Sequence, residues 1–115
     1  MSDPIAPNER RAHPREAASL WVRAFYGTHD AMWADGVLID MSKGGCKLKI
    51  GAIYPLPARI RLLQVRGGVV YDARVRWRRG DLTGIAFEGT RTLEGCEDAD
   101  LARLLPIWHG LLAMA

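Results

Sequence analysis

Apolar and polar residues alternate along most of residues 17–89, a pattern typical of β-strands that bury one face. The alternation is strongest in residues 69–78, where every second residue is apolar and aspartate or arginine fills most of the positions between. Six stretches have strand character: residues 20–26, 36–41, 46–50, 59–65, 69–78 and 82–88. Glycine-rich turns such as Gly67-Gly68 separate them, so we predict an all-β fold, a closed or nearly closed six-stranded antiparallel barrel.

The apolar period changes to that of a helix after Gly89. Apolar residues then recur with the spacing of one helix face, at Leu101, Leu104, Leu105, Trp108, Leu111 and Leu112. This spacing predicts a C-terminal helix over about residues 97–113, with a kink or break near Pro106. We expect the apolar face of the helix to seal one opening of the barrel, and contact with a partner protein is the alternative.

Residues 1–16 differ from the rest of the chain because they are polar, contain three prolines and show no apolar period. We therefore expect a flexible N-terminal arm, followed by one domain in residues 17–115. Residues 17–89 of that domain form the predicted barrel. A chain of 115 residues is long enough to build one hydrophobic core.

The composition and motifs of the chain argue against several classes of protein: membrane-spanning, secreted, zinc-binding and catalytic. No apolar run approaches the roughly 20 residues of a membrane-spanning helix, and the first residues lack the layout of a secretory signal. We therefore expect a cytoplasmic protein without membrane insertion. Cys46 and Cys96 have no metal-type spacing, which argues against a zinc site or a disulfide scaffold. No catalytic pair of side chains and no phosphate-binding loop is recognisable, so we expect neither enzymatic activity nor a cofactor.

An arginine cluster, Arg10, Arg11 and Arg15, lies in the predicted arm. Thirteen of the sixteen basic residues in the chain are arginine, whose planar guanidinium matches phosphate and the Hoogsteen edge of guanine. Pro14 disfavours a helix here, so Arg11 and Arg15 can lie up to about 13 to 14 Å apart and contact different parts of one ligand. A solvated tail is the alternative interpretation.

A second polar group, Asp40 and Ser42, is predicted at the end of a strand. Two residues apart on a strand, both side chains point to the same face. A carboxylate there accepts hydrogen bonds from a guanine base, and a hydroxyl serves sugar, phosphate or base. Gly44 and Gly45 allow the backbone to approach a ligand closely. The alternative is that Asp40 and Ser42 only brace the turn.

These residues, in this order and at these separations, resemble the PilZ domain family. The resemblance covers the chain from about Arg10 to Glu88 with the following helix. It rests on the arginine cluster, Asp40-x-Ser42-x-x-Gly45, Val75-Arg76-Trp77 and Gly84-Ile85-Ala86-Phe87. The two signature motifs, RxxxR and (D/N)xSxxG, are short, but their occurrence together across a six-strand pattern is specific.

The resemblance implies a PilZ-type β-barrel that binds the bacterial second messenger cyclic di-GMP. Arg11 and Arg15 match the family's arginines, which contact phosphates and guanine. The second motif lines the barrel surface beside another guanine, and its matching residues here are Asp40, Ser42 and Gly45. Arg10 occupies the position that, in other members, often accompanies an intercalated pair of messenger molecules. Gly44 is a further candidate contact.

Trp77 and the arginines around it allow two interpretations. The alternation of Trp77 with Ala73 and Val75 predicts a position in the core. The alternative places Trp77 at the barrel rim, where it stacks near a guanine. Three arginines of the same strand are predicted to form an outward basic stripe, Arg74, Arg76 and Arg78.

The predicted function is therefore that of a receptor that changes conformation on binding and signals to a downstream protein in motility, exopolysaccharide and biofilm, or pilus control. One alternative is a PilZ-fold adaptor that binds proteins and no nucleotide, but degenerate members usually lack the motifs that are present here. A small basic barrel for RNA or single-stranded DNA is the other alternative. Such barrels expose several aromatic residues, whereas most aromatics here lie on faces predicted to be buried, so we expect no nucleic acid polymer as partner.

Overall fold

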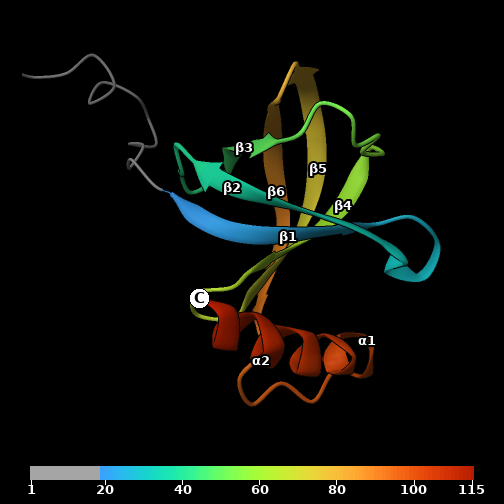
Figure 1. Ribbon diagram of the computed structural model, residues 1–115, viewed down its shortest axis with the longest axis vertical. Helices are drawn as coiled ribbons and strands as arrows, with labels where there is room; N and C mark the ends of the chain where they lie inside the picture. The colour runs from blue at the N-terminus through green and yellow to red at the C-terminus, as the bar shows by residue number, and fades with distance from the viewer. Residues whose placement is uncertain (1–18) are drawn as a thin grey trace, which may run out of the picture.

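The computed structural model describes residues 19–115, and it confirms a six-stranded antiparallel β-barrel followed by a C-terminal helix (Figure 1). The strands are β1 (Leu20–Tyr26), β2 (Met32–Ile39), β3 (Gly45–Ile50), β4 (Arg59–Gln64), β5 (Val69–Arg79) and β6 (Leu82–Thr92). They close in the order β1-β2-β3-β6-β5-β4. A short 3-10 turn, η2 (Thr28–Asp30), joins β1 to β2, and the helix has two segments, α1 (Ala99–Ala102) and α2 (Leu104–Met114).

The interior of the barrel contains the apolar residues that the alternation predicted. In β3, Cys46, Leu48 and Ile50 belong to the inner core, while the two lysines between them are more exposed. The β4–β5 hairpin also turns as expected, because Gly67 and Gly68 have φ angles of 94° and 63°, the left-handed region that glycine adopts readily.

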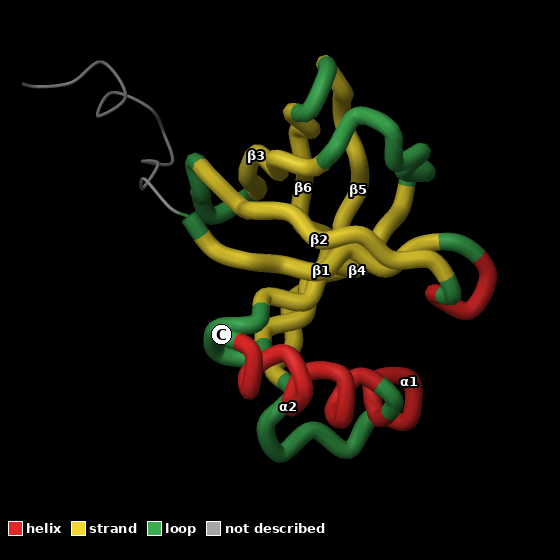
Figure 2. The backbone as a smooth tube through the Cα atoms, in the orientation of Figure 1, coloured by secondary structure: helices red, strands yellow, loops and turns green. Residues whose placement is uncertain are grey.

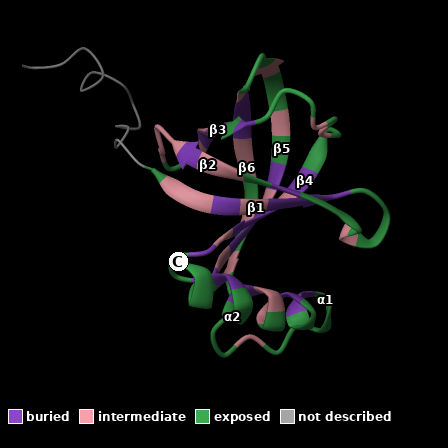
Figure 3. Ribbon diagram, viewed as in Figure 1, coloured by how far each residue is buried: buried purple, intermediate pink, exposed green. Residues whose placement is uncertain are grey.

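A second apolar layer lies on the outside of the barrel wall. Phe25 belongs to this layer, whereas its neighbours Ala24 and Tyr26 belong to the inner core, so the two clusters occupy opposite faces of β1. The outer layer is Phe25, Leu63, Val65, Val70, Leu93, Leu101, Leu104, Trp108 and Leu111. Figure 3 shows the buried residues of the helical segments on the side toward the strands. The helix therefore packs against the outer wall, and the expectation that it seals a barrel opening is wrong.

The helix breaks at Arg103, three residues before Pro106. A proline removes one helical hydrogen bond and clashes with the carbonyl four residues earlier, which is that of Ala102, the last residue of α1. Pro106 itself then lies in the first turn of α2, where its missing N–H is not needed. None of the helices within residues 19–115 has the length and apolar character that crossing a membrane requires.

Two strands, β2 and β6, differ from the prediction by more than one residue at an end. β2 begins at Met32 rather than Gly36 and ends at Ile39 rather than Met41. β6 continues to Thr92 because its last residues pair with the beginning of β5, with Val69 opposite Thr92. The long β5–β6 pair therefore extends from the barrel toward the helix, as the backbone tube in Figure 2 shows.

Ion pairs join the helix to the barrel at this end. Arg91 of β6 lies 3.2 Å from a carboxylate oxygen of Asp72 and 3.2 Å from one of Asp100, which lies in the first turn of α1. Arg61 of β4 lies 3.1 Å from Asp30 of η2 and 3.5 Å from Asp100. Each pair near the surface contributes little alone, but the shared carboxylates connect five elements, β4, β5, β6, η2 and α1, in one network.

Candidate functional site

The turn between β2 and β3 contains the predicted Asp-x-Ser motif. Asp40 has a φ of 56°, in the left-handed region that aspartate tolerates better than most residues. The prediction that Asp40 and Ser42 share the face of a strand is therefore wrong, because β2 ends before Asp40. The backbone N–H of Ser42 donates to the carbonyl of Gly45 at 2.8 Å, and its hydroxyl donates to the same oxygen at 3.2 Å. Ser42 thus braces the turn with its hydroxyl hydrogen, which leaves both lone pairs of the hydroxyl oxygen available as acceptors.

The two glycines of this turn have different surroundings. A Cβ added at Gly45 would lie 2.1 Å from the carbonyl oxygen of Ile85, so β3 and β6 approach each other at a position where only glycine fits. A Cβ added at Gly44 would meet nothing within 4 Å. Gly45 is therefore required by the sheet, whereas Gly44 is open to solvent or to a ligand.

An open hollow of about 370 Å³ lies where this turn meets β3, β5 and β6. It lies on the outer wall, because its floor includes Gly45 and Lys47, which alternate with inward-facing Cys46 and Leu48. The lining residues are Ser42, Gly44, Gly45, Cys46, Lys47, Arg76, Trp77, Gly84, Ile85 and Ala86. The structure therefore brings Trp77 together with two of the predicted motif residues, Ser42 and Gly45, and with the further candidate Gly44, across strands that are distant in sequence.

The predicted core position of Trp77 is wrong, since 43% of this residue is exposed. The cause is a β-bulge in β5. Val75 pairs with Ile85 and Trp77 pairs with Gly84, so Arg76 is an extra residue on the β5 side of the ladder. The bulge reverses the alternation, and Trp77 points outward although Ala73 and Val75 point toward the core.

Trp77 lies directly over Gly84. A Cβ added at Gly84 would lie 2.1 Å from the indole Nε1 and 2.3 Å from Cε2. Lys47 of β3 pairs with Gly84 on its other side, so Lys47, Gly84 and Trp77 form one row across β3, β6 and β5. The sequence analysis did not identify Lys47 or Gly84 as site residues. The outward position of Lys47 in β3, close to the Asp40–Gly45 turn, was the signal that could have indicated Lys47.

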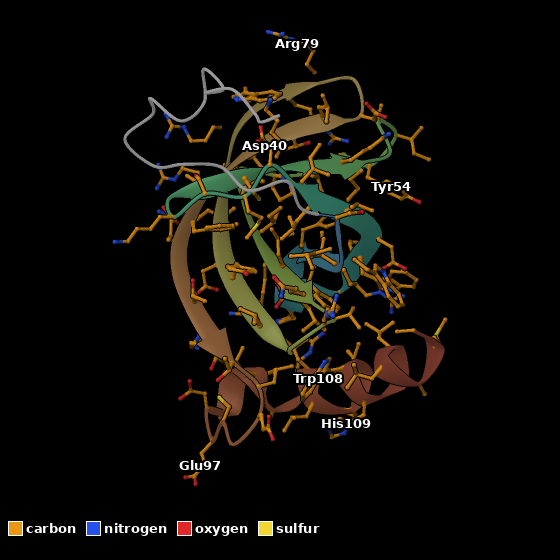
Figure 4. All side chains as sticks on the ribbon, turned by 90° about the vertical axis from the view of Figure 1, so that its left-hand side faces the viewer. Asp40, Tyr54, Arg79, Glu97, Trp108 and His109 are labelled. Atoms are coloured by element: carbon orange, nitrogen blue, oxygen red, sulfur yellow. The ribbon has the colours of Figure 1, made fainter. Side chains whose placement is uncertain are left out.

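The hollow has an excess of positive charge. Lys47 Nζ lies 3.4 Å from a carboxylate oxygen of Asp40, which brings Asp40 to the hollow's edge although it is not part of the lining. Figure 4 shows Asp40 in the upper part of the barrel and Arg79 projecting from the β5–β6 turn beyond it. Arg76 lines the hollow and is exposed. Such a surface favours an anionic ligand.

The predicted stripe of three arginines on β5 is not a single surface. Arg74 pairs with Glu88 at 2.9 Å, and Arg76 lies at the hollow. The guanidinium of Arg78 instead donates to the carbonyl oxygens of Tyr54 and, at 2.7 Å, of Gly51, in the loop that follows β3. The bulge at Arg76 separates Arg78 from the other two.

Cys46 lines the hollow but offers no nucleophile. Burial raises the pKa of its thiol to about 12, so it stays protonated at neutral pH. Cys46 and Cys96 are both free, and Cys96 is only half-buried. Within residues 19–115, no group of histidine, cysteine or carboxylate side chains is arranged to bind a metal ion.

The predicted arginine cluster, Arg10, Arg11 and Arg15, lies outside the described residues. The first described residues are nevertheless close to the candidate site. Leu20 at the beginning of β1 pairs with Leu38, two residues before Asp40. Figure 1 likewise shows the start of β1 and the β2–β3 turn on the same side of the barrel, opposite η2.

Comparison with protein-family models matches residues 9–105 to the PilZ domain. The matched range contains the three arginines, the Asp40 to Gly45 turn and all six strands. Searches of curated proteins and of solved structures gave no match.

Proposed function

Because the chain belongs to the PilZ domain family, we propose that it is a cytoplasmic receptor for the second messenger cyclic di-GMP. PilZ domains typically bind this messenger and are generally non-catalytic receptors. The observation on which the proposal rests is that both family motifs lie within the matched residues, with the second motif at the edge of an open, cationic hollow.

The chemistry of the two motifs is complementary to this ligand. Guanidinium groups of Arg11 and Arg15 donate paired, charge-assisted hydrogen bonds to phosphate and to the Hoogsteen edge of guanine. The Asp40 carboxylate accepts hydrogen bonds from the Watson–Crick edge of a second guanine. Ser42 and the glycines of the turn, Gly44 and Gly45, provide a hydroxyl and bare backbone beside that base.

The path of the chain allows the arginines and the Asp40 turn to contact the same ligand. Arg15 precedes Leu20 by five residues, a span of about 17 Å at most. Leu20 itself pairs beside the end of β2, from which the Asp40 turn departs. Both arginines of the motif are therefore tethered within reach of the turn, and one ligand can bridge the arm and the barrel.

Ligand binding then produces a change of shape that another protein can recognise. The phosphates neutralise mutually repelling guanidinium groups, so the arm can fold over the barrel. A downstream protein in motility, exopolysaccharide or pilus control would recognise the covered surface. With Arg10 ahead of the RxxxR motif, we propose an intercalated pair of messenger molecules as the bound species.

Isothermal titration calorimetry with cyclic di-GMP tests the proposal. We expect wild-type binding in the micromolar range or tighter, with two ligands per chain. Arg11→Ala and Arg15→Ala each remove charge-assisted bonds, so each should weaken binding at least tenfold. Asp40→Asn keeps a side chain that tolerates the left-handed conformation but removes the charge, and it should also weaken binding.

Arg66→Ala is the matched control, because Arg66 is an exposed arginine in the β4–β5 turn. Unchanged affinity in both arginine-motif variants would contradict the assignment of the arm. A single ligand per chain would overturn only the intercalated pair.

A further inference from the structure

We infer that the end of α2 is a self-association surface, on which Met114 of one copy of the chain inserts into an apolar groove beside α2 of a second copy, and the reverse. The contact uses neither family motif and does not rest on the proposed function. It takes up the alternative that the sequence left open for the helix, contact with a partner protein.

The groove lies between the beginning of β1 and the end of α2, and we call it the helix-end groove. It has a volume of about 330 Å³ and a mostly apolar lining, to which Trp21 of β1, Val65 and Leu112 of α2 contribute. Among the described residues, Arg66 supplies its one charged side chain. Figure 1 shows the end of α2 on the same side of the molecule as the start of β1. An open apolar groove of this kind suits an apolar side chain from another molecule.

Met114 stands beside the helix-end groove without lining it. In the sequence it lies between Leu112 and Ala115, which both line the groove. Met114 is 72% exposed, and its flexible thioether side chain adapts to irregular apolar spaces. A projecting side chain next to a groove is self-complementary under two-fold symmetry, because each copy supplies one side chain and receives one.

The outer side of α2 also suits contact with its own copy. None of the 11 residues of α2 is lysine, arginine, aspartate or glutamate, although a quarter of the chain is charged. In a two-fold contact a charged residue near the axis meets its own like charge, so an uncharged helix avoids this repulsion. A Cβ added at Gly110 would meet nothing within 4 Å, so a second helix can approach α2 closely there. The exposed residues of this side are Pro106, His109, Gly110 and Ala113.

The segment that precedes Ser19 matches the groove less well than a second copy does. This segment contains Arg10, Arg11 and Arg15, and the charged side chain of the groove, Arg66, has the same sign. Placing arginines on an apolar surface beside another arginine costs both desolvation and repulsion. A second copy instead presents an uncharged helix end with a projecting methionine.

The size of the surface sets the strength of the contact. With 11 residues, α2 is about 16 Å long. The helix and the adjoining strands together are about 20 Å wide, so the surface covers roughly 300 Å² in projection. Stable dimers bury about 800 Å² per partner. The dimer is therefore weak and forms at high protein concentration.

The experiment is sedimentation equilibrium of the full chain between about 10 µM and about 1 mM, a range that reveals weak association. We expect the wild type to shift from monomer to dimer, with little loss of dimer in high salt because the contact is apolar. Met114→Lys should stay monomeric, since an ammonium group does not enter an apolar groove beside Arg66. Ile53→Lys is the matched control, because Ile53 is 84% exposed in the loop after β3, and it should dimerise as the wild type does.

Isotope-filtered NMR on a mixture of labelled and unlabelled wild-type chains is a second readout that needs no variant. We expect an intermolecular contact between the Met114 methyl group and the Trp21 indole. A wild type that stays monomeric up to about 1 mM would overturn the inference. A dimer that Met114→Lys leaves intact would also overturn it, as would contact of Trp21 with residues 1–18 of its own chain in place of Met114. Calorimetry with cyclic di-GMP tests the proposed function separately from all of these outcomes.

Discussion

The indole nitrogen of Trp108 donates a hydrogen bond of 2.7 Å to the carbonyl oxygen of Val65, and this bond attaches α2 to the end of β4. The ring also packs on Gly68, where an added Cβ would lie 2.5 Å from it. Figure 4 shows Trp108 between the helix and the barrel, with His109 directed outward. This hydrogen bond lies within the largely apolar layer and adds to the ion pairs of Asp100 in attaching the helix.

Trp108→Phe should keep most of the packing but remove the indole donor, so that the Val65 carbonyl accepts only from the Gly68 N–H at 3.4 Å. We expect a loss of about 1–3 kcal/mol in the free energy of unfolding, measured with urea. His109→Ala, an exposed neighbour on α2, should change stability by less than about 0.5 kcal/mol. Equal effects of the two substitutions would show that the hydrogen bond contributes nothing.

The adjacent glycines of the β2–β3 turn should respond differently to alanine. Gly45→Ala forces a methyl group against the Ile85 carbonyl and should cost about 1–3 kcal/mol or more, because backbone cannot yield as a side chain does. Gly44→Ala should fold with nearly wild-type stability. Thermal unfolding of the two variants is the measurement, and a stable Gly45→Ala protein would contradict the close approach of β3 and β6.

Gly84 and Trp77 should be energetically coupled. Gly84→Ala should destabilise the wild type by about 1–3 kcal/mol, because the indole must leave its place. In a Trp77→Ala background the same substitution should cost much less, since the space is then empty. A double-mutant cycle in urea measures this coupling, and additive effects would exclude the contact.

Arg78 should stabilise the loop after β3, because its guanidinium donates to two carbonyl oxygens there. Arg78→Met keeps the aliphatic stem and should lower stability by about 2 kcal/mol or more, given the strength of charged hydrogen bonds. Arg79→Met, at the β5–β6 turn, is the control and should have little effect. Limited proteolysis should also cleave within residues 51–58 faster in the Arg78→Met variant than in the wild type, and the Arg79→Met variant should show no such increase.

Alkaline pH should destabilise the protein through its inner core. Burial raises the pKa of Cys46 to about 12 and also raises that of Tyr71 above its ordinary value of 10.0. The folded state keeps the proton on the Cys46 thiol, whereas the unfolded chain loses it from about pH 9 upward. The contribution of this thiol to the free energy of unfolding is therefore fully present below about pH 9 and declines as the pH rises toward 12.

Each such group lowers the free energy of unfolding by up to about 1.4 kcal/mol per pH unit in this range. Urea unfolding at several pH values should give a shallower decline for Cys46→Ala than for the wild type. Cys96→Ala leaves the buried thiol in place and should preserve the slope. An identical slope in Cys46→Ala would mean that this thiol is not responsible.

The sequence was sufficient to predict the barrel, because burial of one strand face is visible locally as alternation. Residues 46–50 and 69–75 show this directly, and the glycines at 67 and 68 marked a turn that the structure contains. The resemblance to the PilZ domain also needed only short motifs in the right order, and the family match confirms it.

The errors have a common physical origin, since each depended on backbone geometry that side-chain types do not reveal. Alternation in the sequence continues without interruption through Val75 and Trp77, so nothing signalled the bulge at Arg76. The left-handed conformation of Asp40 likewise ends β2 earlier than its apolar residues suggested. The helix packs on the outer face of β1, where Phe25 is buried against it. In the sequence, Phe25 looks like any other apolar residue of a strand, so nothing indicated that this face is covered by the helix.

The bulge in β5 adds a cation to the wall of the hollow, because its additional residue is Arg76. Deleting Arg76 would leave Val75 opposite Ile85 and Trp77 opposite Gly84 in an uninterrupted ladder, so Trp77 would still point outward. The hollow would lose one positive charge and β5 would lose the bend that a bulge produces. A chain that shares every motif residue but lacks this one residue would therefore present a straighter and less cationic wall to its ligand.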